Sequence, residues 1–185
     1  MLREQDSGRA DPIASVLGFF RALERALGDL EASGAARAAA TRVFDVEAPG
    51  YRDDLEQALF PLLKRRLRGS PDDAPGRARA AIGGMPGATD ENEDALRQEL
   101  LLLEGGLQRL EDAWRRLRPR LSRASAAETA DFAEGWREHM ERMEHRILPQ
   151  LHARLARCDL EALAEAMARH RGRAWESLAE DAAGR

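Results

Sequence analysis

The chain has 185 residues, a length typical of one domain that can bury a core of its own. Aromatic residues make up only 5%, while alanine, leucine, glutamate and arginine dominate, so the composition favours packed helices over sheets. The 29 basic and 33 acidic residues are interspersed and give a net charge of -4, which leaves no broad basic face for a nucleic-acid partner.

The surroundings expected for the protein follow from its cysteine content and its termini. Cys158 is the only cysteine, so no disulfide can form within the chain, and an exposed thiol suits a reducing compartment. The first residues lack the apolar segment of a signal peptide, and no stretch approaches the roughly 20 apolar residues of a membrane-spanning helix. We therefore expect a cytoplasmic protein with no membrane partner.

The first predicted helix follows a flexible N-terminus of residues 1–10. Asp11 supplies an N-cap acceptor, and Pro12 occupies the first helical position, where its missing N–H does no harm. Apolar residues then recur at steps of three and four: Ile13, Val16, Phe20, Leu23, Leu27 and Leu30. A second, short helix is predicted over residues 35–47, and Ala48-Pro49-Gly50 should interrupt it.

Two longer predicted helices flank a connection that is rich in glycine, proline and aspartate. The first covers residues 51–68, with a kink expected at Pro61. The connection, residues 69–92, has no sustained period and should be a long mobile loop. The strongest helix follows and ends near Pro119; its seam consists of Leu96, Leu100, Leu103, Leu107, Leu110, Trp114, Leu117 and Leu121.

The last part of the chain predicts one more long helix and accessory helices behind it. The long helix runs over residues 126–157 with a kink expected at Pro149, and residues 159–185 form accessory C-terminal helices with a break at Arg171-Gly172. Four long amphipathic helices can bury their apolar stripes against one another. The sequence thus predicts an all-α single domain, residues 1–185, folded as an antiparallel up-and-down four-helix bundle.

Two segments carry a resemblance to a known family. Residues 48–61 (APGYRDDLEQALFP) and 139–149 (HMERMEHRILP) each place an acidic helical turn before an apolar pair and a proline. They resemble the second and fourth helices of the hemerythrin-like, or HHE cation-binding, family, and the opening helix, the Trp114 region and residues 166–172 are similar to its bacterial members.

This resemblance implies an antiparallel four-helix bundle around a non-haem di-iron centre, and it assigns ligand positions. The histidine of the first helix falls on Phe20, and the His-x-x-x-Glu pair of the second falls on Tyr51 and Leu55, with Glu56 one step further. The pair of the third helix falls on Leu100 and Glu104 or on Leu107 and Glu111, and only the fourth helix keeps its pattern, as His139 and Glu144.

The histidines decide what we expect of this site. All four, His139, His145, His152 and His170, lie at or after residue 139, so the first three helices contain none. With apolar side chains at the lost ligand positions, we expect the space between Phe20, Tyr51, Leu55 and His139 to be filled and dry. The sequence then favours a degenerate di-iron site, no cofactor, and a non-catalytic structural, regulatory or interaction module.

The alternative function is an iron-binding, redox or oxygen- or nitric-oxide-responsive protein. Its rebuilt metal site would use His139 and Glu144, with Glu56, Glu104, Glu111 and Tyr51 as helpers, and dioxygen or nitric oxide would bind only to that metal. Tyr51 either ligates iron as a phenolate or packs inward and gives its hydroxyl to a carboxylate such as Glu144.

A further alternative is that the helical faces bind a protein. A groove, or the end of the chain around Trp175, could dock a partner helix, and the same apolar faces could serve self-association. The pair Gly105-Gly106 lies inside the strongest predicted helix, where each glycine costs about 1 kcal/mol relative to alanine, and either permits close helix approach or marks a bulge.

Overall fold

A computed structural model describes residues 11–32, 35–67 and 88–183, although within these the side chains at 35, 39, 88–90, 152 and 171–183 are not described. The regular structure of the described part is helical throughout and contains no strand, which confirms the all-α prediction. No helix in that part combines the length and the apolar character needed to cross a membrane. The predicted flexible N-terminus and most of the predicted loop 69–92 lie outside the described residues.

The first helix, α1 (Pro12–Glu31), begins as its sequence predicts. The Asp11 side chain accepts a hydrogen bond from the Ile13 N–H at 2.9 Å, and Pro12 follows the cap directly. The apolar residues of its predicted stripe are all buried: Ile13, Val16, Phe20, Leu23, Leu27 and Leu30. This face fixes the side of α1 that turns toward the other helices.

The chain from Ala35 to Leu67 is helical without a break, so the predicted interruption at Ala48-Pro49-Gly50 is wrong. Proline is accommodated by a wider π-type turn just before it, and the same happens at two later prolines. In order, the elements are α2 (Ala35–Arg42), η1 (Val43–Glu47), α3 (Ala48–Asp54), η2 (Leu55–Leu59) and α4 (Phe60–Leu67), and beyond them η4 (Met143–Ile147) and α8 (Leu148–Arg154).

Each of these π turns ends two residues before a proline. The N–H of Ala48, Phe60 and Leu148 bonds to the carbonyl five residues earlier, on Val43, Leu55 and Met143 respectively. Proline has no N–H, and its ring clashes with the carbonyl four residues before it in a regular helix. One added residue in the turn relieves this conflict, so the kinks predicted at Pro61 and Pro149 take the form of π turns within continuing helices.

The second half of the chain contains α6 (Ala88–Leu117), η3 (Arg118–Arg123) and α7 (Ala126–Arg142). Because α6 begins at Ala88, the last residues of the predicted loop, 88–92, are helical. Ser125 caps α7 in a capping box: its hydroxyl accepts from the Glu128 N–H at 3.2 Å, and the Glu128 carboxylate accepts from the Ser125 N–H at 2.9 Å.

The C-terminal helix α9 (Arg157–Ala183) is one continuous helix rather than two accessory pieces. The predicted break at Arg171-Gly172 is therefore wrong, since a single glycine weakens a helix without ending it. Asp159 lies in the first turn of α9, and its carboxylate accepts from the Ala156 N–H at 3.0 Å. This contact stabilises the sharp corner between α8 and α9.

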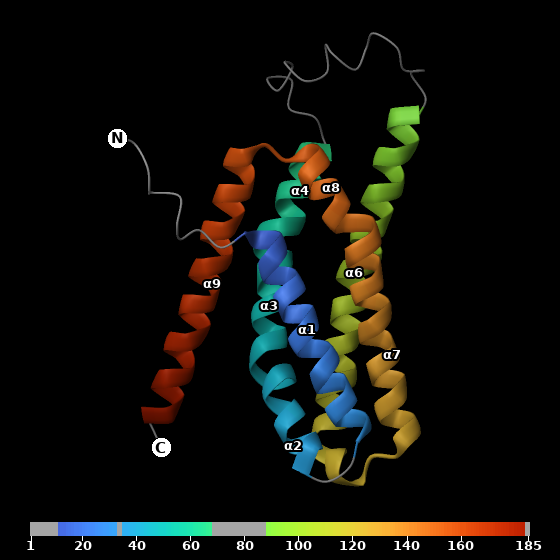
Figure 1. The fold of residues 1–185 in the computed structure, drawn as a ribbon, viewed down its shortest axis with the longest axis vertical. Helices are drawn as coiled ribbons and strands as arrows, with labels where there is room; N and C mark the ends of the chain where they lie inside the picture. The colour runs from blue at the N-terminus through green and yellow to red at the C-terminus, as the bar shows by residue number, and fades with distance from the viewer. Residues whose placement is uncertain (1–10, 33–34, 68–87, 184–185) are drawn as a thin grey trace, which may run out of the picture.

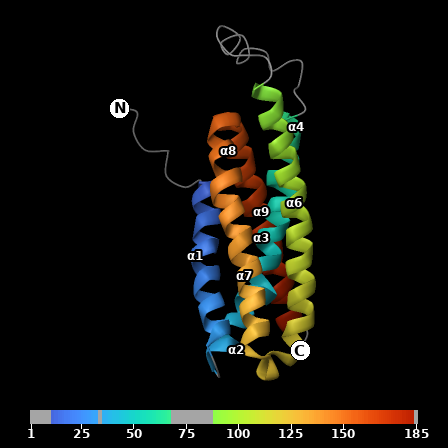
Figure 2. The ribbon, with the colours of Figure 1, turned by 90° about the vertical axis from the view of Figure 1, so that its right-hand side faces the viewer.

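The helices lie side by side with their long axes close to parallel (Figure 1). In contact are α1 with α2 and α7, α6 with α4 and α7, and α9 with α3 and α1. The view turned by 90° shows α1, α7 and α6 next to one another and α9 behind them (Figure 2). The buried apolar residues form one cluster that runs through all of these helices, including Leu163 and Met167 of α9.

One glycine allows α7 to approach α6 closely, and it is not either of those noted in the sequence. A Cβ atom on Gly135 would lie 3.1 Å from the Leu110 side chain. At Gly105 and Gly106 an added Cβ would meet only the flexible guanidinium of Arg109, at 3.4 and 3.9 Å. Close helix approach therefore depends on Gly135, and the pair Gly105-Gly106 lies within the continuous helix α6.

Candidate functional site

Three positions that the resemblance assigns to metal ligands lie in the centre of the molecule, where an aromatic cluster surrounds them. Phe20 of α1, Tyr51 of α3 and Leu55 of η2 are buried, with 4%, 4% and 0% of their surface exposed. Phe19 stacks on Tyr51 with ring centroids 4.4 Å apart, and Phe20 meets the same ring edge-on at 5.7 Å. We call Phe19, Phe20, Tyr51, Trp136 and His139 the aromatic centre.

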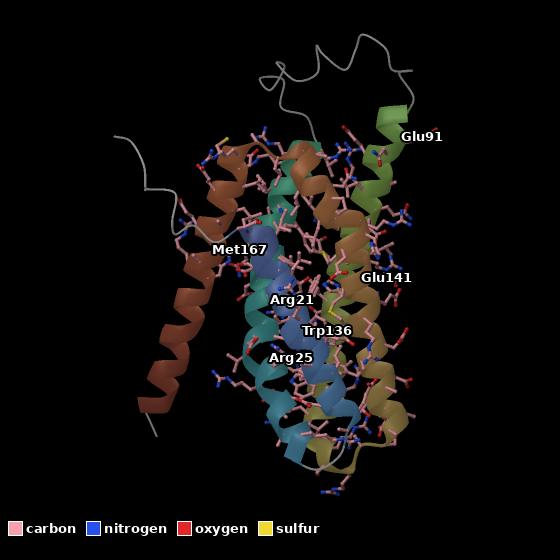
Figure 3. The ribbon with its side chains drawn as sticks, in the orientation of Figure 1. Arg21, Arg25, Glu91, Trp136, Glu141 and Met167 are labelled. Atoms are coloured by element: carbon pink, nitrogen blue, oxygen red, sulfur yellow. The ribbon has the colours of Figure 1, made fainter. Side chains whose placement is uncertain are left out.

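Helix α7 contributes two residues to this centre. Trp136 and His139 are each 4% exposed, and their rings meet edge-on with centroids 5.7 Å apart. Figure 3 shows Trp136 at mid-height of the molecule, among the side chains between the helices. Neither the contact of Trp136 with His139 nor the part played by Phe19 was predicted from the sequence.

Within the described part of the chain, the side chain of His139 makes one hydrogen bond, which is with Tyr51. The Tyr51 hydroxyl lies 3.0 Å from His139 Nε2, and this contact joins α3 to α7. Burial, together with the positive charge of Arg142, lowers the pKa of His139 to about 3, so the imidazole is neutral at pH 7. Burial and then the charge of Asp54 raise the pKa of Tyr51, so the phenol is also neutral.

The direction of the Tyr51–His139 hydrogen bond follows from counting the buried polar groups that each direction leaves unsatisfied. If Tyr51 donates to Nε2, the ring proton is on Nδ1, and one buried donor has no partner among the described residues. If Nε2 donates instead, both the Tyr51 O–H and the bare Nδ1 lack partners in that part of the chain. The first arrangement leaves fewer unsatisfied groups, so we assign Tyr51 as the donor.

Glu144 does not share this environment. It is exposed on η4 and lines a shallow surface depression with Phe20, Arg21, Glu24 and His145. His139, one turn earlier, lines a different groove, between α6 and α7. The Tyr51 hydroxyl therefore contacts His139 rather than the carboxylate suggested from the sequence. Glu144 follows His139 by five residues, which rotates a helical side chain by about 140°, so the two residues point to different sides of the helix.

The three helper carboxylates lie in a charged seam, which we define as Arg52, Glu56, Lys64, Glu104 and Glu111, between the α3–α4 run and α6. Glu111 pairs with Arg52 and with Arg115, at 2.7 Å from the latter, and Glu104 pairs with Lys64. Partial burial raises the pKa of Glu56. The positive charge of Arg52 lowers this pKa, while the negative charges of Glu111 and Glu104 raise it. The carboxylates are thus near one another, but each is paired with a cation, Glu56 with Arg52 at 3.8 Å.

The third-helix register stays open, because both candidate positions face the core. Leu100 and Leu107 are seven residues apart and are 0% and 2% exposed. In each register the paired glutamate, Glu104 or Glu111, lies in the charged seam. His145 is exposed on η4, and the side chains of His152 and Trp175 lie outside the described residues.

A buried acidic residue that the sequence reasoning missed is Asp54. It is 0% exposed on α3, and its Oδ1 lies 3.4 Å from Nδ1 of His170 on α9. Its position one helical turn after Tyr51, on the same inward face, was the signal available in the sequence. The contact links α9 to α3 and brings a second histidine against the inner helices, away from the aromatic centre.

The donor set at the aromatic centre does not fit a di-iron centre. Phe20 and Leu55 have no atom that can bind a metal, and the Tyr51 oxygen is engaged with His139. Across the described residues, no group of three or more histidine, cysteine, aspartate and glutamate side chains comes together as metal ligands would. The arrangement instead holds a neutral imidazole against a neutral phenol within packed rings.

Comparisons with known proteins give no relative from which a role could be transferred. No protein-family model matches the chain, and no curated protein or solved structure matches it significantly. The family resemblance therefore rests on the sequence segments in which it was found.

Proposed function

We propose that the protein is a hemerythrin-like, up-and-down four-helix-bundle protein of the cytoplasm, with a degenerate di-iron site and a non-catalytic structural, regulatory or interaction role. The observation that supports this proposal is the packing of the aromatic centre over the positions where the family binds iron. Phe19 and Phe20 both lie against Tyr51, whose hydroxyl is engaged with His139.

To bind iron, the aromatic centre would need metal ligands at positions that other side chains now occupy. Iron in such a bundle needs several imidazole and carboxylate ligands that point to one place. Here His139 is the imidazole of the centre, and the Glu144 carboxylate is exposed at a different surface. A single imidazole binds a divalent ion weakly, so the proposal expects no stoichiometric iron.

Metal analysis of the purified protein tests the proposal directly. The wild-type chain, expressed with added iron and also reconstituted anaerobically with Fe(II), should contain iron far below one atom per chain. His139→Ala and the surface control His145→Ala should give the same low content. Near-stoichiometric iron in the wild type that disappears in His139→Ala and persists in His145→Ala would overturn the proposal.

The second candidate is an iron-binding, dioxygen- or nitric-oxide-responsive protein with a carboxylate-rich site. The observation that favours it is the proximity of Glu56, Glu104 and Glu111, whose charges act on one another. It predicts a ferric absorption band that responds to dioxygen or nitric oxide and is lost in Glu104→Gln. Glu141→Gln, an exposed glutamate on α7, is the matched control, and a colourless protein after reconstitution would rule this candidate out.

A further inference from the structure

Helix α6 has an outer face, which we define as the side opposite its buried residues Leu100, Leu103 and Leu107. The helix lies at the edge of the bundle, in contact with α4 and α7 (Figure 2). Leu101 and Leu102 lie on the outer face and are 63% and 45% exposed, and they are the exposed large hydrophobic residues of the described part of the chain. Contact with a second protein surface would remove this apolar area from water.

The pair Gly105-Gly106 lies one turn further along the same face. A Cβ atom at either position would meet only the guanidinium of Arg109, so the backbone of α6 is open to approach from outside. Glycine weakens a helix relative to alanine, and no close contact between the described helices depends on this pair. The missing side chains leave a hollow in the helix surface, into which a leucine of another helix can pack.

Charged residues without an ion-pair partner lie toward the two ends of the outer face. Glu91, near the start of α6, is exposed at the edge of the molecule (Figure 3), and Arg109 and Arg116 are exposed in the second half of the helix. None of these three makes an ion pair with another described residue, whereas Arg115, the neighbour of Arg116, pairs with Glu111. The unpaired charges of this face are therefore negative at one end and positive at the other.

The order of these residues makes the outer face complementary to itself. Four pairs of residues share a midpoint that falls between residues 103 and 104: Glu91 with Arg116, Gln98 with Arg109, Leu101 with Gly106 and Leu102 with Gly105. In two antiparallel copies of α6 related by a two-fold axis at that midpoint, each residue lies opposite the other member of its pair. Leucines then meet glycines near the axis, and opposite charges meet at both ends.

We propose that the protein forms a homodimer in which the outer faces of two α6 helices pack antiparallel. Leu101 and Leu102 of one copy lie over Gly105 and Gly106 of the other, and Glu91 pairs with Arg116 at both ends, about 19 Å from the two-fold axis. A crossing angle of about 20° keeps these long side chains within reach of one another. The dimer does not depend on the proposed loss of iron, because the outer face lies away from the aromatic centre.

Sedimentation equilibrium of the full chain over a range of concentrations tests for the dimer. The average mass should rise with concentration from the 20.5 kDa of the monomer toward twice that value. One helix face on each copy is a small interface, so we expect a dissociation constant in the micromolar range. Leu101→Gln changes a side chain that is 63% exposed, so the monomer should keep its circular dichroism spectrum, while dimerisation should weaken about tenfold or more.

A charge exchange tests the antiparallel alignment. Arg116→Glu places two glutamates opposite each other at both ends and should weaken dimerisation severalfold, and Glu91→Arg should do the same with two arginines. The double variant Glu91→Arg/Arg116→Glu restores opposite charges and should dimerise within about threefold of the wild type. Arg25→Glu is the matched control: it changes an exposed arginine of α1, alters the net charge as Arg116→Glu does, and should leave dimerisation unchanged.

Three results would overturn the proposal. One is a monomer at every concentration, as expected if another segment of the chain or a different protein covers the outer face. Another is a dimer that Leu101→Gln leaves intact, because a different surface would then form it. The last is a double charge variant that dimerises no better than Arg116→Glu alone, because the two residues would then not lie opposite each other.

Discussion

The aromatic centre and the charged seam both contain residues at or next to ligand positions of the resembled family, yet their chemistry is opposite. In the aromatic centre, aromatic rings surround a single hydrogen bond between two neutral groups, Tyr51 and His139. In the charged seam, carboxylates on helix edges pair with Arg52 and Lys64 while partly exposed to water. Residues that one resemblance assigns therefore lie in two environments, a buried core and a partly exposed edge, and the two should respond very differently to mutation.

The largest expected effect is in the aromatic centre. Phe20→Ala should lower the free energy of unfolding by about 3–5 kcal/mol, because it removes a buried ring and leaves a cavity. Urea denaturation followed by circular dichroism measures this change. A loss below about 1 kcal/mol would mean that the centre is loosely packed, and the contrast with the charged seam would fail.

Tyr51→Phe tests the hydrogen bond without emptying the core. It should destabilise the protein by about 1–3 kcal/mol, because it leaves the Nε2 of His139 buried without a partner. A double-mutant cycle with His139→Leu separates this contribution from packing. If the two single losses simply add in the double variant, the hydrogen bond does not couple α3 to α7.

The neutral state of His139 predicts a pH dependence. Its folded pKa of about 3 lies below the ordinary value of 6.5, so below pH 6.5 the unfolded chain binds a proton that the folded chain does not. Stability should therefore fall as the pH drops, by about 2 kcal/mol between pH 7 and pH 5.

Urea denaturation at a series of pH values measures this slope. His139→Leu should flatten it, whereas His145→Gln, which changes an exposed histidine, should keep the wild-type slope. An unchanged slope in His139→Leu would show that His139 is not held neutral by burial.

The smallest effect belongs to the charged seam. Glu104→Gln should cost less than about 1 kcal/mol, because the ion pair with Lys64 is partly exposed and screened by water. The difference from wild type should shrink further in 1 M salt, where the Debye length is about 3 Å. Urea denaturation at low and high salt measures both, and a cost of several kcal/mol that is insensitive to salt would place the seam in the core instead.

Much of the fold was predictable because it depends on local signals. The cap at Asp11, the apolar stripe of α1 and the seam from Leu96 to Leu121 were read from spacing alone, and the structure buries those residues as expected. Local signals misled where proline and glycine were taken as breaks. At Pro49 a π turn lets the helix continue, and at Gly172 packing earlier in α9 outweighs the cost of one glycine.

The candidate site was predictable only in part. The burial of Phe20, Tyr51, Leu55 and His139 agrees with their positions on apolar faces. The sequence could not predict which side chains contact one another, because Tyr51 and His139 are 88 residues apart in the chain. The exposure of Glu144 was missed because the resembled pattern pairs it with His139, although five helical residues rotate a side chain by about 140°.

The sequence by itself determined the all-α class, the faces that are buried and the absence of histidine from the first three predicted helices, because helical periodicity and composition are properties of the chain alone. The tertiary structure decided that Tyr51 bonds to His139 and that the helper carboxylates pair with cations. Those outcomes depend on which side chains of distant helices come within hydrogen-bonding distance, and only packing in three dimensions sets that distance.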